Sequence, residues 1–462
     1  DISVLINGLP LVFIEVKKPN NKEGIYSERN RIDKRFKNPK FKDFFNLTQF
    51  IIFSNNMEYD DLNNSLLQGA FYAPSSYNTP KFNYFREEGN FLENLQLKSI
   101  KIEKELEILK DNNLLSIKDS PEFRVNKKPD TPTNKICSSL LSKERLFFLL
   151  KYGFAYVQND NNYEKHILRY PQLFAVKAIE KTFEEKINKG VIWHTQGSGK
   201  TALSYYSTRY FKDYFSKKKI NAKFYFIVDR IDLLEQASLE FQKRGLFVHI
   251  INTKEEFREN IKSKKIIHND FGYEEIILVN IQRFENDLNV IEQNDYNLDI
   301  QRIYFLDEVH RSYNPKGSFL ANLHLSDPSA IKIGLTGTPL LGKDKKTRDI
   351  FGGYIHKYFY NQSIKDGYTL RLIREEISNQ YRRKAKEIIS DLELPKGKIS
   401  SKQLYSKKIF VEPMLEYIIQ DYIKSQIGYD DQSIGAMVIC DSYEQAEIMF
   451  NLFNEKKIKD IK

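Results

Sequence analysis

A glycine-rich loop closed by Gly-Lys-Thr lies at residues 195–201 and directly follows a short apolar run at 191–193. Glycines let backbone N–H groups turn inward onto phosphate oxygens, and a helix that starts after the loop adds its dipole. The lysine reaches the β- and γ-phosphates and the next hydroxyl holds Mg²⁺. The loop therefore predicts an ATP site, with Mg²⁺ at Thr201, made by Thr195, Gly197, Ser198, Gly199, Lys200 and Thr201.

One position departs from the full phosphate-loop pattern, because His194 stands where that pattern has glycine. The alternative reading of the loop is an ordinary glycine-rich turn between a strand and a helix. We expect His194 to pack structurally, and Cys440 to be a buried thiol.

Two further apolar runs end in polar residues that suit the same site. Residues 303–306 lead into Asp307 and Glu308, and residues 333–335 lead into a Thr-Gly-Thr turn. An aspartate there would hold the Mg²⁺ that bridges the phosphates, and the adjacent glutamate would orient or deprotonate the attacking water. A solvated acidic strand end is the alternative, and the Thr-Gly-Thr turn means little by itself.

In this order the three motifs resemble those of superfamily 2 helicases and translocases. The resemblance implies a RecA-like domain, in which His310 completes the acidic ATP-binding box and Thr336, Gly337 and Thr338 couple hydrolysis to movement. Upstream, Arg169 and Gln172 resemble the motif that reads adenine.

Two other segments of this family face the nucleic acid backbone. Here they correspond to DNA-contacting Asp229, Arg230, Gln282 and Arg283. The alternative is structural, because Asp and Arg at a strand end also cap helices and form ion pairs.

The N-terminus carries a second constellation. Two apolar runs within residues 1–17 are joined by Asn7-Gly8, a dipeptide that favours a hairpin. Glu15 and Lys17 are two apart on a strand and share a face, and pairing across the hairpin can bring Asp1 close. Asp1 and Glu15 would hold a metal ion while Lys17 positions or activates water. This kit resembles the PD-(D/E)xK nuclease core; a charged edge strand is the alternative.

A nuclease followed by a translocase resembles the restriction (R, motor) subunit of type I restriction-modification enzymes. The local sequence at residues 48–56, 193–200 and 307–312 resembles this family too. The resemblance implies ATP-dependent translocation of double-stranded DNA and Mg²⁺-dependent cleavage of unmethylated foreign DNA away from the recognition site. It also implies partner subunits for modification (a methyltransferase) and for specificity.

Three departures limit this resemblance. The Gln-x-x-x-Tyr element expected after the nuclease lysine is missing, and residues 30–36 are the nearest helical segment. The chain begins at Asp1, without an upstream acid. Residues 434–442 resemble the first strand of a second RecA-like domain, but the later motifs do not follow. We expect a fragment that binds ATP and hydrolyses it poorly, because charge delivered to the transition state is missing.

Composition is compatible with this interpretation. Lys and Arg exceed Asp and Glu by 72 to 62, a net charge of +10, which suits a phosphate backbone. Two distant cysteines offer neither a disulfide framework nor zinc spacing, which favours a reducing cytoplasm. We find neither a membrane-spanning apolar run nor a signal peptide, so no membrane partner is expected.

The predicted fold class is α/β, with a nuclease domain at 1–118, a linker and connecting helix at 119–160, a RecA-like domain at 161–375 and the start of a second one at 376–462. Strands near 191, 224, 276, 303 and 333 alternate with helices, the pattern of a doubly wound parallel sheet. Residues 119–135 are expected to be linker and 140–157 an amphipathic helix.

Two other functions remain open. One is a repair helicase with an accessory nuclease fold, which would require free ends or single strands. The other is a catalytically silent DNA-binding scaffold, which failure to bind ATP·Mg²⁺ at Lys200 would favour.

Overall fold

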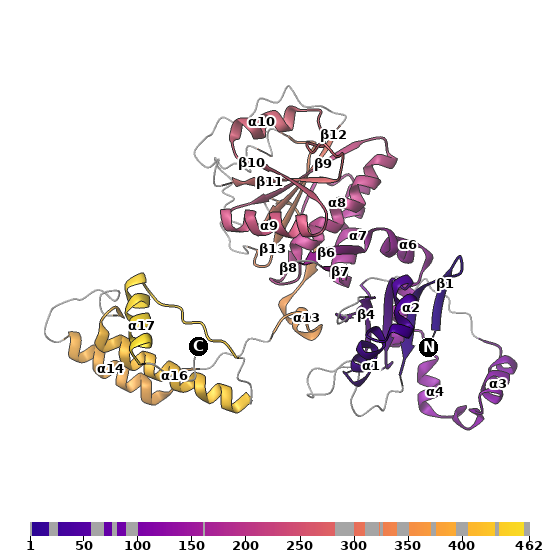
Figure 1. Ribbon diagram of the computed structural model, residues 1–462, viewed down its shortest axis with the longest axis horizontal. Coiled ribbons are helices and arrows are strands. Elements are labelled where there is room, and N and C mark those ends of the chain that lie inside the picture. The colour runs from indigo at the N-terminus through magenta and orange to yellow at the C-terminus, as the bar shows by residue number, and fades with distance from the viewer. Residues whose placement is uncertain are drawn as a thin grey trace. The chain divides into compact units, whose positions relative to one another are not determined.

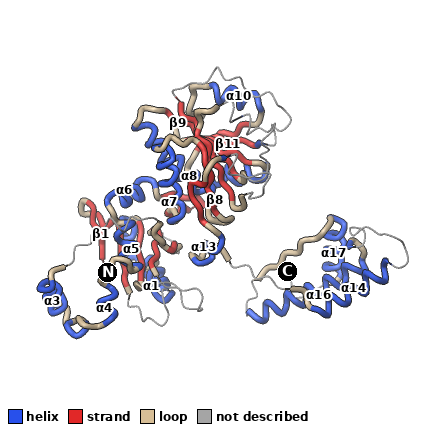
Figure 2. The backbone as a smooth tube through the Cα atoms, turned by 180° about the vertical axis from the view of Figure 1, so that it is seen from behind, coloured by secondary structure: helices blue, strands red, loops and turns tan. Residues whose placement is uncertain are grey.

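The computed structural model divides the chain into two units, Asp1–Arg371 and Leu372–Lys462. It describes residues 2–17, 26–56, 69–75, 81–88, 100–159, 162–281, 300–309, 323, 327–339, 351–370, 376–393, 405–429 and 434–456. The first unit contains sheets and helices, whereas the described part of the second contains helices and no strand (Figures 1 and 2).

The first sheet has five strands in the order β1-β2-β3-β4-β5. β2 and β3 run parallel and the other neighbours are antiparallel. The predicted hairpin is confirmed: Asn7 and Gly8 join β1 and β2 with φ of 49° and 81°, the left-handed pair that a tight hairpin turn requires. The strands are β1 (Ile2–Ile6), β2 (Leu9–Val16), β3 (Phe50–Ser54), β4 (Ala70–Pro74) and β5 (Asn83–Tyr84).

Two helices cover one face of this sheet. Alternate residues of β2 and β3, such as Phe13 and Ile51, pack against Ile32 of α1 (Tyr26–Phe36) and Phe45 of α2 (Lys42–Leu47). The 3₁₀ turn η1 (Pro39–Phe41) links the two helices. The helix expected near residues 27–37 is therefore present, and it lies against the strand that carries Glu15.

The connection to the second sheet is more ordered than the sequence predicted. Residues 119–135, expected to be linker, contain α4 and the start of α5, because Ser120 caps one helix and proline begins each. The helix expected over 140–157 ends at Tyr152, and the alternating residues after Gly153 form a strand instead. The elements are α3 (Ile102–Asp111), η3 (Leu115–Ile117), α4 (Pro121–Asn126), α5 (Pro132–Leu140), α6 (Lys143–Tyr152), β6 (Phe154–Asn159) and β7 (Asn162–Ile167).

The second sheet has seven parallel strands in the order β10-β11-β9-β12-β13-β8-β14. All five predicted strands are present, and β10 and β14 are additional. The strands are β8 (Lys189–His194), β9 (Asn221–Val228), β10 (Phe247–Ile251), β11 (Glu275–Asn280), β12 (Ile300–Asp307), β13 (Ile331–Thr336) and β14 (Tyr354–Tyr358). Since all run parallel, their carboxyl ends meet at one edge of the sheet.

Alternation along each strand assigns the helices to the two faces. Phe224 and Phe226 belong to the cluster that contains α7, α8 and α9, whereas Tyr225 and Ile227 pack with α10 on the other face. The sheet is therefore wound with helices on both sides, as predicted. These helices are α7 (Tyr170–Glu184), α8 (Lys200–Lys217), α9 (Ile231–Lys243) and α10 (Lys254–Lys262), and α13 (Tyr360–Lys365) follows β14.

Within the first unit one hydrophobic cluster joins the two sheets. It contains Phe50 and Tyr72 from the five-stranded sheet together with Tyr170 from α7. The Tyr72 hydroxyl donates to the Leu168 carbonyl at 2.9 Å, and the rings of Phe85 and Tyr170 lie 6.4 Å apart. The five-stranded sheet thus shares a core with the start of the segment that carries the parallel sheet.

The second unit contains α14 (Asn379–Glu393), α16 (Lys408–Tyr429) and α17 (Tyr443–Glu455). Val411 and Leu415 of α16 pack on Met449 and Leu452 of α17. The strand expected at 434–442 is not formed: these residues belong to neither a helix nor a strand, and Met437 and Ile439 are exposed. The reason is that a strand needs a partner, and the described residues of this unit contain no other strand.

Candidate nucleotide and nuclease sites

The phosphate loop has the backbone geometry that its glycines predict. β8 ends at His194, and α8 begins at Lys200 after a turn in which Gly197 and Gly199 have φ of 78° and 83°. A side chain at either position would be strained. Thr195 and Ser198 are buried in the same turn. The loop therefore presents its backbone and the Lys200 side chain at the start of a helix, where an anion is favoured.

Arg169 and Gln172 brace this loop from the start of α7. The Gln172 side chain accepts from the Arg169 backbone N–H at 2.8 Å and donates to the Gly199 carbonyl at 3.0 Å. The Arg169 guanidinium donates to the Gly197 carbonyl at 3.3 Å and lies over the Tyr368 ring. A Cβ at residue 199 would approach the Gln172 amide nitrogen to 2.6 Å. These contacts give both residues a loop-positioning role in addition to the predicted adenine contact.

The acidic pair reaches the loop from β12. The Glu308 carboxylate lies 3.8 Å from the Lys200 ammonium. Burial raises the pKa of Asp307 to about 6, while Lys200 opposes this shift and Glu308 reinforces it. Among the described residues the Asp307 Oδ1 has no hydrogen-bond partner. A buried carboxylate of this kind is stabilised by a cation, so Asp307 fits the predicted Mg²⁺ ligand, with the Thr201 hydroxyl on the adjoining helix.

The Thr-Gly-Thr turn after β13 touches the phosphate loop directly. A Cβ at Gly337 would come within 3.1 Å of the Gln196 nitrogen, and the Trp193 indole donates to the Gly337 carbonyl at 3.2 Å. Within the turn the Thr338 N–H donates to the Thr336 hydroxyl at 3.1 Å. A displacement of this turn would therefore move the loop, and a coupling role requires such a connection.

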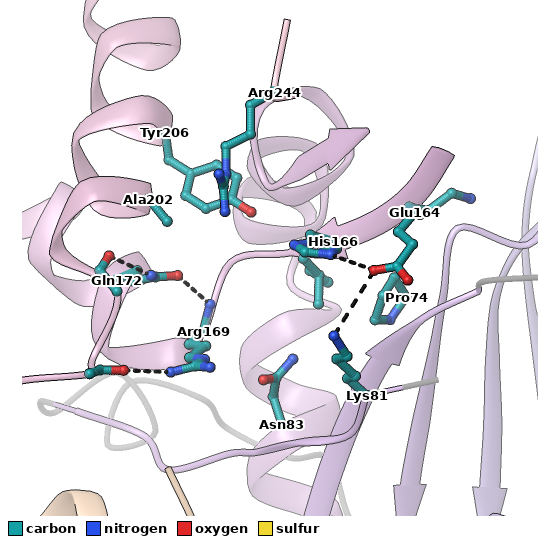
Figure 3. A pocket seen from close by; sticks show the side chains of 14 residues that line it. Pro74, Lys81, Asn83, Glu164, His166, Arg169, Gln172, Ala202, Tyr206 and Arg244 are labelled. Carbon is teal, nitrogen blue, oxygen red and sulfur yellow. Dashed lines mark hydrogen bonds and ion pairs between the residues drawn. The ribbon is translucent and has the colours of Figure 1, made fainter. Parts of the chain in front are cut away.

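A cavity of about 260 Å³ adjoins the loop. One side is formed by Gly197, Gly199 and Tyr206 beside the parallel sheet, and the other by Pro74 and Asn83 of the five-stranded sheet. Figure 3 shows Arg169 and Gln172 between these two walls, with Arg244 above and the ion-paired Lys81 and Glu164 at one end. Its size and place suit the base and sugar of a nucleotide whose phosphates lie on the loop.

The four residues predicted to contact DNA differ in where they lie. Asp229 is buried beyond the end of β9, where its charge acts on Asp307, whereas Arg230 is exposed and lies 3.8 Å from Asp232. Gln282 and Arg283 lie outside the described residues, as do Asp1 of the nuclease constellation and His310 of the acidic box.

The N-terminal sheet brings Glu15 and Lys17 together, as their spacing predicted. Glu15 is fully buried near the end of β2, and the Lys17 ammonium lies 2.7 Å from its Oε1. Two arginines of α1 approach the same carboxylate: Arg35 donates to Oε2 at 3.3 Å and Arg31 lies 3.9 Å from Oε1. Sequence analysis did not single out these arginines, although their spacing of four residues on a helix was the available signal.

The described residues do not by themselves make a metal centre at Glu15. The parts of the chain that the structure describes contain no group of three or more His, Cys, Asp or Glu side chains placed to hold an ion. Glu15 contributes one carboxylate among three cationic side chains. A metal ion there needs a second acid, the role predicted for Asp1.

Comparison with known families places the chain. Residues 171–403 match the family described as SWI2/SNF2 ATPase, which covers the phosphate loop, the acidic pair and the Thr-Gly-Thr turn. The chain therefore belongs to the SWI2/SNF2 ATPase family. Residues 1–62 match the N terminus of the type I restriction enzyme R protein. The joined matches confirm the resemblance to R subunits that the motifs predicted.

Curated relatives agree with this placement. An endonuclease subunit of a type I restriction enzyme from Staphylococcus aureus is 27% identical over 399 residues, covering 83% of this chain and 35% of the relative. A putative one from Methanocaldococcus jannaschii is 27% identical over 468 residues, with coverages of 94% and 40%. The chain thus spans 35% to 40% of the length of these relatives.

Among solved structures, the fragment of a putative HsdR subunit of a type I restriction enzyme from Vibrio vulnificus aligns with 97% of this chain and 62% of its own, at 14% identity. Its TM-score of 0.40 is too low to transfer geometry.

No helix among the described residues is long and apolar enough to cross a membrane.

Proposed function

We propose that the chain carries the nuclease and the ATP-dependent motor of a type I restriction R subunit. In this function ATP hydrolysis drives translocation along double-stranded DNA, and the nuclease cuts unmethylated foreign DNA away from the recognition site. Modification and specificity subunits select the site, and the complex acts in the cytoplasm. Membership of the SWI2/SNF2 family and the restriction-type N terminus support the proposal.

The observation that carries the proposal is the meeting of three motifs at one sheet edge. The backbone register places Asp307 beside Leu335, and Thr336 beside Trp193. Lys200 and Glu308 approach to 3.8 Å across this edge. A phosphate cradle and two adjacent acids at its edge are the groups that nucleoside triphosphate hydrolysis requires.

Each group has a role that follows from its surroundings. The loop N–H groups and Lys200 bind the β- and γ-phosphates. Asp307 and Thr201 would hold Mg²⁺, which supplies charge neutralisation on the phosphates when bound. Glu308 orients the attacking water or accepts its proton. Gly337 lies against the loop, so the turn of Thr336, Gly337 and Thr338 would transmit its displacement.

For cleavage we assign Glu15, with Asp1, to the binding of a second Mg²⁺, and Lys17 to the positioning of water. The 2.7 Å pair of Glu15 and Lys17 supports this assignment. DNA contacts are assigned to Arg230, Gln282 and Arg283. Asp229, predicted as a fourth contact, is buried and is not assigned to DNA.

The test is cleavage of covalently closed circular DNA by the R subunit with its methyltransferase and specificity partners, ATP and Mg²⁺. Three variants are compared with wild type: Lys200→Ala, Lys17→Ala and the control Lys212→Ala. Lys212 is on the same helix as Lys200 but pairs with Glu274 away from the loop. ATP hydrolysis is measured in the same samples.

We expect Lys200→Ala to lose both ATP hydrolysis and cleavage, Lys17→Ala to lose cleavage alone, and the control to keep both. Cutting by Lys200→Ala at the wild-type rate would show that the motor does not drive cleavage. Equal loss of both activities in Lys17→Ala would contradict the two-site proposal.

A further inference from the structure

Three successive charged residues after β5 connect the nuclease segment to three different elements. Arg86 donates to Asp366 beyond α13 at 3.0 Å, and Glu87 accepts from Arg145 of α6 at 2.7 Å and 3.1 Å. Glu88 contacts β14 through His356. Arg86 reaches Tyr358 of β14 through Asp366, whereas Glu88 reaches the phosphate loop through two histidine side chains.

That chain consists of one carboxylate and two imidazoles. The His356 Nε2 lies 2.5 Å from the Glu88 Oε2, and the His356 Nδ1 lies 2.7 Å from the His194 Nε2. The two rings are tilted by 64° with centroids 5.0 Å apart. His194 is fully buried at the end of β8, so the contact is shielded from water.

His194 lies where a small displacement reaches the nucleotide site. The next residue, Thr195, opens the phosphate loop, and its N–H donates to the Tyr358 carbonyl of β14 at 3.0 Å. Gly337 of the Thr-Gly-Thr turn packs close to the His194 carbonyl. β14 therefore holds the entrance of the loop both by its backbone and by the His356 side chain.

The hydrogen-bond chemistry of the chain allows two states. Burial, with His356 and Lys200 nearby, lowers the pKa of His194 well below its ordinary value, so this ring is neutral. If His356 is neutral and donates to Glu88, its Nδ1 accepts from the His194 Nε2–H, and the His194 Nδ1 carries no proton. If His356 is charged, it donates to His194, whose proton then resides on Nδ1.

The second ring nitrogen of His194, Nδ1, is not used by the contacts described so far. This nitrogen is buried and finds no hydrogen-bond partner within the described residues. The direction of the hydrogen bonds through His356 thus decides whether this buried nitrogen of His194 is an acceptor or a donor. Five ionisable groups make up or adjoin this series of hydrogen bonds. They are Glu88 of the nuclease segment, His356 and Tyr358 of β14, His194 of β8 and Lys200 of α8.

We propose that Glu88 is a positioning residue for the ATPase: through His356 it sets the tautomer and orientation of His194, and so couples the nuclease segment to the phosphate loop. The inference rests on the proposed function, in which this loop binds ATP. His194, predicted from the sequence to be structural only, becomes the receiving end of an interdomain contact.

The test measures two properties of the whole protein between about pH 6 and about pH 8, where imidazoles titrate. One is the affinity for a fluorescent ATP analogue with Mg²⁺. The other is the intrinsic emission of Trp193, the only tryptophan in the chain and the neighbour of His194, without nucleotide. Wild type is compared with Glu88→Gln and with the control Glu87→Gln, which alters an adjacent interdomain ion pair that does not reach the loop.

We expect Glu88→Gln to weaken analogue binding by about threefold to tenfold, since one charged hydrogen bond is lost two contacts away. We also expect it to move the pH profile of Trp193 emission. Glu87→Gln should change neither. His356→Gln, which cuts the chain from the motor side, should repeat the effect if Glu88→Gln does not fold.

Wild-type affinity and an unchanged Trp193 profile in Glu88→Gln would overturn the inference. An equal effect in Glu87→Gln would also overturn it, because any loosening of the domain contact would then suffice. If wild type itself fails to bind the analogue, the proposed function fails, whereas the Trp193 profiles still decide whether Glu88 acts on His194.

Discussion

The Lys200 ammonium lies 3.8 Å from the Glu308 carboxylate, although the two residues belong to different motifs. Each satisfies the charge of the other at the edge of the sheet. A nucleotide phosphate would compete for Lys200, because it offers more negative charge and more acceptor oxygens than one carboxylate. Displacement of the pair would leave Glu308 available for the attacking water.

Glu308→Gln should therefore retain ATP binding and lose hydrolysis. The amide keeps the size of the side chain but cannot accept a proton, and loss of a general base typically lowers the rate by about a hundredfold or more. Equilibrium binding and single-turnover hydrolysis of ATP would measure the two effects separately. Hydrolysis at the wild-type rate would remove Glu308 from the mechanism.

The Gly199→Ala variant should weaken nucleotide binding more than backbone strain explains. Its φ of 83° disfavours alanine by about 1–2 kcal/mol, and the new Cβ would also strike the Gln172 amide. Gly245→Ala is a matched control, because Gly245 has the same φ but no atom within 4 Å of a Cβ. Gly199→Ala should lower both the melting temperature and the affinity for ATP more than Gly245→Ala does. Equal losses in the two variants would exclude a role for Gln172.

Lys223→Met tests the charge buried in the motor sheet. Burial, with Arg302 nearby, lowers the pKa of Lys223 to about 8, and its ammonium donates to the Asn260 carbonyl at 2.6 Å. Because the unfolded chain then holds more protons between about pH 8 and about pH 10.5, wild-type stability should rise with pH in this window. Keeping Lys223 ionised in the folded protein lowers the free energy of unfolding by about 3 kcal/mol at pH 7.

The pH-dependent rise in the free energy of unfolding should be smaller by about that amount in Lys223→Met. Denaturant unfolding at about pH 7 and about pH 10 measures it, and the comparison within each protein cancels the loss of the hydrogen bond to Asn260. Parallel pH profiles for wild type and variant would contradict the lowered pKa.

Arg35→Ala should destabilise the nuclease segment. Glu15 is fully buried, and the loss of its hydrogen bond to Arg35 should cost about 1.5–3 kcal/mol even though Lys17 remains. Lys34→Ala is the control, because Lys34 neighbours Arg35 on α1 but is exposed. Urea unfolding would compare the two, and indistinguishable midpoints would show that Lys17 suffices for Glu15.

Local pattern alone determined much of this protein. Glycines at 197 and 199, with the lysine after them, predict the phosphate loop because only glycine readily adopts the left-handed turn. The five predicted strands of the motor sheet could be read because buried parallel strands are continuous apolar runs. β10 and β14 escaped prediction because polar or aromatic residues interrupt their runs, and β14 pairs only at the sheet edge.

Tertiary structure alone decided which distant residues meet. The side chain of Gln172 braces Gly199, Arg35 reaches Glu15, and Glu88 reaches His194 through His356. Spacing can place Arg31 and Arg35 on one face of a helix, but it does not say which partner that face will meet. The same limit explains the strand wrongly expected at 434–442, since strand formation depends on a partner. Local backbone preference is encoded residue by residue, whereas pairing and burial depend on how separate elements pack.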